Sequence, residues 1–160
     1  MKKILSFIFI VALLISCKPK TTQTEETFSM PDVQDVAMYQ VNPRVFAPQN
    51  SLNAVTARLD SIKALGVNVL WVMPIYPIGV EKGKNSPYCI KDYTAIAPEF
   101  GTIDDFKNLV SECHKRGIGI ILDWVANHTA WDHPWVNEHP EWYTHDEKAD
   151  PIFHPRPWDL

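Results

Sequence analysis

The sequence is poor in cysteine and glycine, and it has no long apolar run. Its three cysteines have no metal-type spacing, which argues against a zinc site built from cysteine. No glycine-rich turn follows the first expected strand, so the phosphate cradle of a dinucleotide-binding fold is missing. Basic residues are not clustered and the formal net charge is −4, which argues against a nucleic-acid partner. With 160 residues, the chain is long enough for one ordinary domain.

The N-terminal residues have the pattern of an export signal. Two lysines precede an apolar run from Ile4 to Ile15, which is too short to span a bilayer as a helix. The ending Leu14-Ile15-Ser16-Cys17 resembles a bacterial lipobox, in which the cysteine is lipidated and becomes the first residue of the mature protein. We therefore expect a lipoprotein signal peptide at 1–16, a lipid on Cys17 and export to the cell envelope, at the outer membrane or cell surface. A short transmembrane or buried helix is the alternative.

Three short apolar runs predict β-strands in the remainder of the chain. They lie at 36–41, 67–73 and 118–124, and each is stopped by a proline or by polar residues. Because the runs are continuous rather than alternating, we expect a parallel sheet whose strands are buried on both faces.

Apolar residues at helical spacing lie between the expected strands. They predict one helix over 52–65, for which Gly66 supplies the C-terminal stop. A second helix begins at Thr102, whose hydroxyl can form a capping box with Asp105, and Gly117 ends it. The resulting order of elements is β-α-β-α-β.

Cys113 falls on the expected buried stripe of the second helix, together with Phe106, Leu109 and Val110. We therefore expect it to be a small core residue. A disulfide between Cys113 and Cys89 is the alternative in an exported protein.

A β/α barrel and an open doubly wound sheet both fit this order of elements. The positions of the long loops favour the barrel. They follow the second strand, at 74–101, and the third strand, from 125 onward. These are the carboxyl ends of the strands, where barrel enzymes build their active sites.

Three polar side chains lie at the end of the third expected strand or shortly after it. Asp123, Asn127 and His128 come after the apolar run that ends in Leu122. Polar groups buried at such a place need specific partners, because an unpaired polar group in a dry site costs a few kcal/mol. The arrangement therefore predicts part of an active site.

Four segments carry a family resemblance, and in chain order they are Met38-Tyr39-Gln40-Val41-Asn42-Pro43-Arg44-Val45-Phe46, Leu65-Gly66-Val67-Asn68-Val69-Leu70-Trp71-Val72-Met73-Pro74-Ile75, the stretch from Ser86-Pro87-Tyr88 to Phe100-Gly101-Thr102, and Asp123-Trp124-Val125-Ala126-Asn127-His128. They resemble the N-terminal part of the catalytic domain of the α-amylase family of glycoside hydrolases. The resemblance implies the N-terminal portion of a (β/α)8 TIM barrel, with about three strands over 34–126. The start of a small inserted domain would occupy 127–160, and the polar residues 17–33 would be a flexible tether.

The resemblance implies retaining hydrolysis of α-glucosidic bonds in starch-like glucans or oligosaccharides. Asp123 would bind an arginine that orients the nucleophile, because a carboxylate fixes the geometry of a guanidinium. His128 would donate a hydrogen bond to a sugar hydroxyl, and Tyr88 would stack on the sugar ring. Asn127 is a calcium ligand in members with structural calcium. Cys89 stands where the family usually has aspartate.

The resemblance also places the nucleophile and the general acid on later strands, outside these 160 residues. We therefore expect the polypeptide to be inactive alone. The expected origin is an incomplete gene, a truncated gene prediction or a frameshift.

Three other readings of the sequence remain open. A non-catalytic carbohydrate-binding lipoprotein would use the aromatic residues Trp131, Trp135, Trp142, Tyr143 and Trp158. A metal-dependent hydrolase would use the histidines His128, His133, His139, His145 and His154, although their spacing does not place two ligands on one helix face. A structural interaction protein has only the tether and the lipid anchor in its favour.

Overall fold

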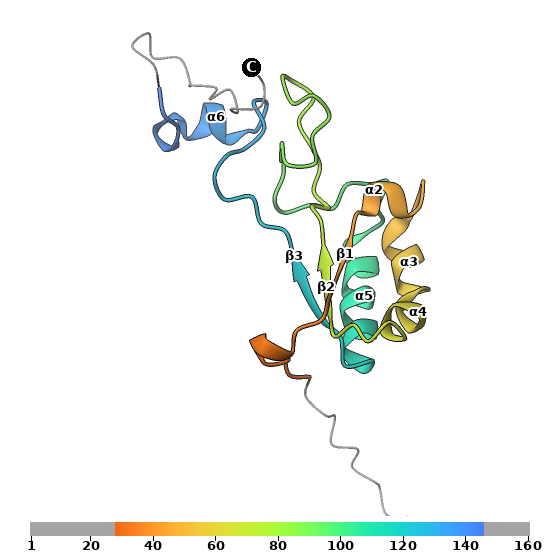
Figure 1. Ribbon diagram of the computed structural model, residues 1–160. Coiled ribbons are helices and arrows are strands. Elements are labelled where there is room, and N and C mark those ends of the chain that lie inside the picture. The colour runs from red at the N-terminus through yellow and green to blue at the C-terminus, as the bar shows by residue number, and fades with distance from the viewer. Residues whose placement is uncertain (1–27, 146–160) are drawn as a thin grey trace, which may run out of the picture.

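The computed structural model describes residues 28–145, in which three parallel strands form a sheet in the order β1-β2-β3 (Figure 1). The strands are β1 (Met38–Val41), β2 (Val69–Val72) and β3 (Gly119–Leu122). All three predicted strands are confirmed, although each is shorter than its apolar run. In the register, Trp71 lies between Gln40 of β1 and Ile121 of β3.

Short helices make up the rest of the regular structure. In chain order they are η1 (Val33–Asp35), α2 (Pro43–Phe46), α3 (Ser51–Thr56), α4 (Leu59–Lys63), α5 (Ile103–Lys115), α6 (Trp135–Glu138) and η2 (Pro140–Trp142). The helices α3, α4 and α5 all lie on the same side of the sheet, as Figure 1 shows. Both crossovers therefore cover one face, and the neighbours in the sheet are consecutive strands, which is the arrangement of a barrel wall and not of a doubly wound sheet.

The second helix begins where its cap was predicted. The Thr102 hydroxyl accepts a hydrogen bond from the Asp105 N–H, and the Asp105 carboxylate accepts one from the Thr102 N–H, so the capping box is complete. Gly117 follows the helix with a φ of 64°, a left-handed conformation that glycine adopts without strain.

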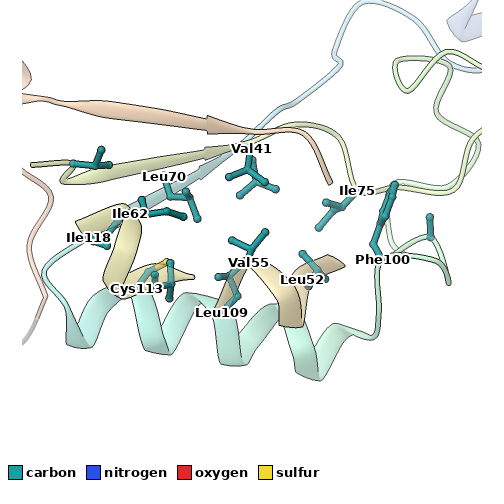
Figure 2. Close-up of a cluster of buried hydrophobic side chains, with 14 residues drawn as sticks. Val41, Leu52, Val55, Ile62, Leu70, Ile75, Phe100, Leu109, Cys113 and Ile118 are labelled. Carbon is teal, nitrogen blue, oxygen red and sulfur yellow. The ribbon is translucent and has the colours of Figure 1, made fainter. Parts of the chain in front are cut away.

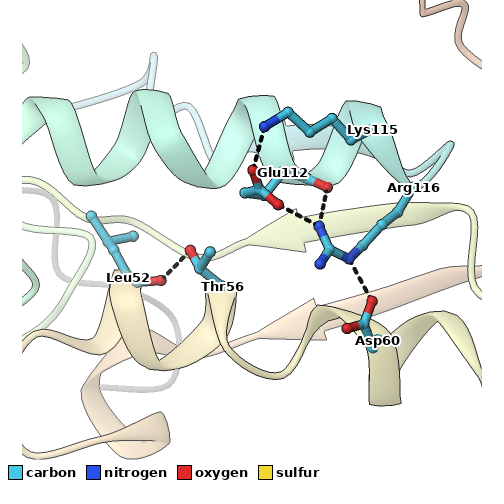
Figure 3. A network of polar contacts seen from close by, with 6 residues as sticks. All are labelled: Leu52, Thr56, Asp60, Glu112, Lys115 and Arg116. Atoms are coloured by element: carbon cyan, nitrogen blue, oxygen red, sulfur yellow. Dashed lines mark hydrogen bonds and ion pairs between the residues drawn. The ribbon is translucent and has the colours of Figure 1, made fainter.

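The predicted helix over 52–65 is instead two helices, α3 and α4. The Thr56 hydroxyl donates a hydrogen bond to the Leu52 carbonyl at 2.9 Å (Figure 3). Such a bond to the carbonyl four residues back competes with the helical ladder and bends helices. Leu65 follows the end of α4 and is exposed, so the predicted buried stripe ends at Ile62.

An ion-pair network joins α5 to α4, as Figure 3 shows. Arg116 Nε lies 2.6 Å from Asp60 Oδ1, and Arg116 Nη1 lies 2.6 Å from Glu112 Oε2. Hydrogen bonding to Arg116 lowers the pKa of Asp60 below its usual value. Asp60 is solvent-exposed, so the network orients the two helices more than it stabilises them.

The hydrophobic core lies between the sheet and the three helices (Figure 2). Leu70 and Val72 of β2 meet Leu52 of α3 and Leu109 of α5 there. Cys113 is fully buried in this cluster, and burial raises the pKa of its thiol to about 11. The prediction of a core cysteine is confirmed, and Cys89 and Cys113 are both free thiols.

The other face of the sheet is largely uncovered. Met38 of β1 is 46% exposed and Ile121 of β3 is 37% exposed. The expectation of strands buried on both faces is therefore wrong for these residues, because helices cover only the opposite face. Residues at the end of the expected tether do contact the domain: Phe28 stacks on His114 with ring centroids 4.2 Å apart.

Within residues 28–145, no helix combines the length and apolar character needed to cross a bilayer. Cys17 and the expected signal peptide lie outside the described residues.

Candidate active site

Asp123 lies at the carboxyl end of β3, and two aromatic side chains converge on its carboxylate. Trp71 Nε1 donates a hydrogen bond to Oδ1 at 2.9 Å, and the Tyr88 hydroxyl donates one to Oδ2 at 3.3 Å. Trp71 comes from β2 and Tyr88 from the long loop after it. The structure therefore brings Tyr88 and Asp123 together, as expected for two residues of one site.

The sheet geometry explains why Trp71 reaches Asp123. Trp71 pairs with Ile121, and Asp123 follows Ile121 by two residues, so all three side chains lie on the same face. This is the face that the helices leave uncovered. A carboxylate has about four lone-pair sites, so Asp123 can accept further donors beside Trp71 and Tyr88.

Tyrosines surround this carboxylate and are held in their neutral, donating form. Burial is the main cause that raises the pKa of Tyr88 and of Tyr76, and the charge of Asp123 raises both further. The Tyr76 hydroxyl lies 3.4 Å from the Asp123 carbonyl oxygen. A phenol that stays protonated can donate to a carboxylate and to a bound hydroxyl group alike.

Tyr93 fixes the backbone that carries Asn127 and His128. Its hydroxyl lies 2.8 Å from the carbonyl oxygens of both Val125 and His128. The side chains of Asn127 and His128 are exposed, and Asn127 Nδ2 lies 3.3 Å from His128 Nδ1. With Nδ1 as acceptor, the neutral imidazole carries its proton on Nε2, which is the tautomer that can donate outward.

A calcium ion at Asn127 stays a prediction, because its further ligands are expected in the segment after residue 127, of which residues 146–160 lie outside the described part of the chain. Calcium takes about six to eight oxygen ligands, usually with carboxylates among them. Nowhere in residues 28–145 do three His, Cys, Asp or Glu side chains gather in a way that could hold a metal ion.

Two of the histidines considered for a metal-dependent hydrolase, His133 and His139, are engaged in packing, whereas His128 is exposed. His133 is buried, its Nδ1 accepts the Trp135 N–H at 3.0 Å, and burial lowers its pKa. His139 stacks on Trp142 with ring centroids 4.0 Å apart. His154 lies outside the described residues.

Most aromatic residues of the expected sugar platform are packed against neighbours. Lys82 Nζ lies 3.5 Å above the Trp131 ring, and Trp135 stacks on Tyr93. Among the described residues of this platform, Trp142 is the more exposed at 59%, and Trp135 is 37% exposed. Trp158 lies outside the described residues.

Two residues of the site were missed by the sequence prediction, Trp71 and Tyr93. Both stand in segments that carry the family resemblance, but no role was assigned to either. The signal for Trp71 is strand alternation, because the next-to-last side chain of β2 shares a face with the residue that follows β3. Tyr93 contacts backbone about 30 residues away in sequence, so its role has no local signal.

A comparison with known proteins explains this geometry. The family model described as "Alpha amylase, catalytic domain" matches residues 27–157. The chain belongs to the α-amylase family. The structural likeness agrees: an α-amylase from Lactobacillus plantarum superposes with a TM-score of 0.71 at 39% identity, over 79% of this chain and 31% of that one.

Curated relatives within the α-amylase family cover the same part of the chain. A probable oligo-1,6-glucosidase of Bacillus subtilis is 40% identical over 111 residues, which is 66% of this chain and 19% of the relative. The α-amylase SusG of Bacteroides thetaiotaomicron is 48% identical over 87 residues, or 54% of this chain and 12% of the relative. The chain thus spans about a fifth or less of the length of these curated relatives. The three parallel strands are the first part of the family's barrel.

Proposed function

We propose that this chain supplies the non-reacting side of the active site of a glycoside hydrolase that cleaves α-glucosidic bonds of starch-like glucans or oligosaccharides. The observation that carries the proposal is the convergence of Trp71 and Tyr88 on the Asp123 carboxylate at the carboxyl edge of the sheet. The names of the relatives, an oligo-1,6-glucosidase and α-amylases, support a substrate of α-linked glucose.

In this proposal each residue has a role that does not involve bond breaking. Asp123 accepts an arginine fork and thereby orients the nucleophile that this arginine contacts. Tyr88 presents a ring face to the sugar, while His128 donates from Nε2 to a sugar hydroxyl. Retaining hydrolysis needs two further carboxylates about 5 Å apart, as nucleophile and as acid and base. We assign neither role to any carboxylate of residues 28–145.

A chimaeric enzyme tests the proposal. Residues 28–145 replace the matched segment of the Lactobacillus plantarum α-amylase, so that a complete barrel carries this chain's part of the site. We expect the chimaera to hydrolyse maltoheptaose, and we expect the 160-residue polypeptide alone to show no hydrolysis. The unmodified enzyme is the positive control. A chimaera that unfolds cooperatively but releases no sugar would contradict the proposal.

A non-catalytic carbohydrate-binding protein is the second candidate, and the exposed ring of Trp142 favours it. Affinity electrophoresis of the 160-residue polypeptide in starch gels separates the two. Retardation that Tyr88→Ala abolishes and Trp142→Ala leaves intact supports the enzyme site. Retardation that Trp142→Ala abolishes and Tyr88→Ala leaves intact supports the non-catalytic carbohydrate-binding protein.

We propose further that Cys17 is lipidated and holds the exported protein on the cell envelope. The proposal rests on the Leu-Ile-Ser-Cys sequence alone. Replacing Cys17 with serine is expected to move the protein from the membrane fraction to the soluble fraction, because it removes the acyl chains. Fractionation of cells that express either form measures this. Ser16→Ala is the matched control, since it retains the cysteine, and a Cys17→Ser protein that stays with the membranes would refute lipid anchoring.

A further inference from the structure

Asp132 joins two loops at the carboxyl end of the sheet. Its side chain is only 10% exposed. Oδ2 accepts hydrogen bonds from Lys91 Nζ at 2.8 Å and from the Val80 N–H at 3.3 Å. Lys91 and Val80 belong to the loop after β2, whereas Asp132 belongs to the segment after β3. One carboxylate therefore ties these two segments together.

The other oxygen of Asp132 lies against Gly79 and makes no hydrogen bond. Oδ1 is buried and has no hydrogen-bond partner. A Cβ added at Gly79 would lie 2.1 Å from this oxygen and 2.4 Å from the Ala130 Cβ. A side chain at residue 79 would therefore clash with Asp132 and Ala130 unless they moved. The contact fixes how closely the two loops approach.

Asp132 carries a negative charge in this position. Burial raises the pKa of the Asp132 carboxyl, whereas the hydrogen bonds from Lys91 and from the Val80 N–H lower it. The lowering prevails, so the pKa lies below its usual value. A buried charge that loses its partner is costly, so the pair with Lys91 resists separation.

The loop held in this way carries Tyr88. It is closed at its base by hydrogen bonds from the Gly79 N–H to the Cys89 carbonyl and from the Lys91 N–H to the Pro77 carbonyl, both at 2.9 Å. The Ala130 N–H donates to the Ile90 carbonyl at 2.7 Å, beside the Asp132 contact. Tyr88 lies directly before this base.

The tip of the loop is strained and needs support from outside. Lys82, Lys84 and Asn85 all have φ between 46° and 57°, a region that non-glycine residues rarely adopt. Support comes from both sides, because Arg44 Nη1 donates to the Asn85 carbonyl at 2.7 Å and Lys82 lies over the Trp131 ring. The segment that contains Trp131 is the one that Asp132 anchors.

We propose that Asp132 is a positioning residue that holds the loop from Pro77 to Lys91 against the segment after β3 and thereby places the Tyr88 hydroxyl on Asp123. The consequence for sugar binding rests on the proposed function, whereas the anchoring itself does not. The two parts can therefore be tested separately.

The two free cysteines provide a test of the anchoring. Cys89 lies at the base of the loop beside Tyr88, while Cys113 is fully buried in the core. In the 160-residue chain with Cys17→Ser, the rate at which each thiol reacts with iodoacetamide is followed by peptide mass spectrometry. Asp132→Ala is expected to raise the Cys89 rate about tenfold or more and to leave Cys113 protected.

Three further variants sharpen this result. Gly79→Ala leaves Asp132 in place but forces the loops apart, so it is expected to release Cys89 as Asp132→Ala does. Asp132→Asn retains an acceptor for Val80 and is expected to restore part of the protection. Glu81→Ala is the matched control, because Glu81 is an exposed acid of the same loop. A Cys89 rate in Asp132→Ala within twofold of the control, or a Cys113 rate that rises in parallel, would overturn the anchoring role.

Affinity electrophoresis in starch gels tests the link to Tyr88. Asp132→Ala and Tyr88→Ala are each expected to weaken retardation in the gel. The double variant is expected to be retarded as much as Tyr88→Ala alone, because both substitutions act through the Tyr88 ring. Additive losses would overturn the link. If the starting chain is not retarded at all, the proposed sugar site fails, while the thiol rates still decide the role of Asp132.

Discussion

Replacing Asp123 with alanine in the chimaeric enzyme is expected to lower kcat for maltoheptaose hydrolysis about 100-fold or more. The change removes the acceptor for Trp71 and Tyr88 and leaves two partly buried donors without this partner. In the proposed site it also frees the arginine that orients the nucleophile. A misplacement of about 1 Å at the reacting atoms can cost about 100-fold in rate.

Two variants show whether the charge or the shape of Asp123 matters. Asp123→Asn retains an acceptor for Trp71 but not the charge, so we expect a loss between those of wild type and Asp123→Ala. Asp104→Ala is the control, because Asp104 is an exposed acid in the first turn of α5 whose carboxylate pairs with Lys107. Steady-state kinetics on purified, folded chimaeras give kcat and KM for each variant. A kcat for Asp123→Ala within threefold of the parent chimaera would rule out the orienting role.

Leu109→Ala is expected to lower the free energy of unfolding by about 2–5 kcal/mol. Leu109 is 0% exposed and lies at the centre of the layer between α5 and the sheet (Figure 2). Truncation removes buried apolar surface and leaves a cavity that close packing cannot fill. A loss of this size is a large part of the stability of a typical domain, which is about 5–15 kcal/mol.

Urea unfolding of the chimaera, followed by circular dichroism, measures this effect. Ile103→Ala is the matched control on the same helix, because Ile103 is 53% exposed. We expect it to cost less than about 1 kcal/mol. Equal losses for the two variants would show that α5 does not pack through Leu109.

The regular elements were predictable because local patterns determine them. The apolar run that ends in Leu122 becomes β3, and the Thr102–Asp105 pair caps α5 as predicted. These signals lie within a few residues of the elements they define. The positions of the long loops then favoured the barrel, and the place of Asp123 at the end of a strand indicated an active site. The family resemblance added the specific role of Asp123, which a pattern of apolar residues alone does not give.

Other features depend on contacts between distant segments and were not predicted. The division between α3 and α4 follows from the Thr56 side chain, which propensity does not distinguish from an ordinary exposed residue. The Trp71–Asp123 hydrogen bond spans 52 residues and requires the register of β2 and β3. The Asp132–Lys91 pair joins two irregular segments, for which no periodicity exists.

The one-sided cover of the sheet has a consequence for the order of folding. Most of the main core lies between the strands and α3, α4 and α5, and Ile75, Ala97 and Phe100 join it from the loop after β2. This layer therefore satisfies its packing within the three strands and the two crossovers between them. The opposite face, with Met38 and Ile121, takes no part in that packing. The sheet–helix layer can therefore form during synthesis before the barrel interior is filled, because its contacts connect segments that are near in sequence.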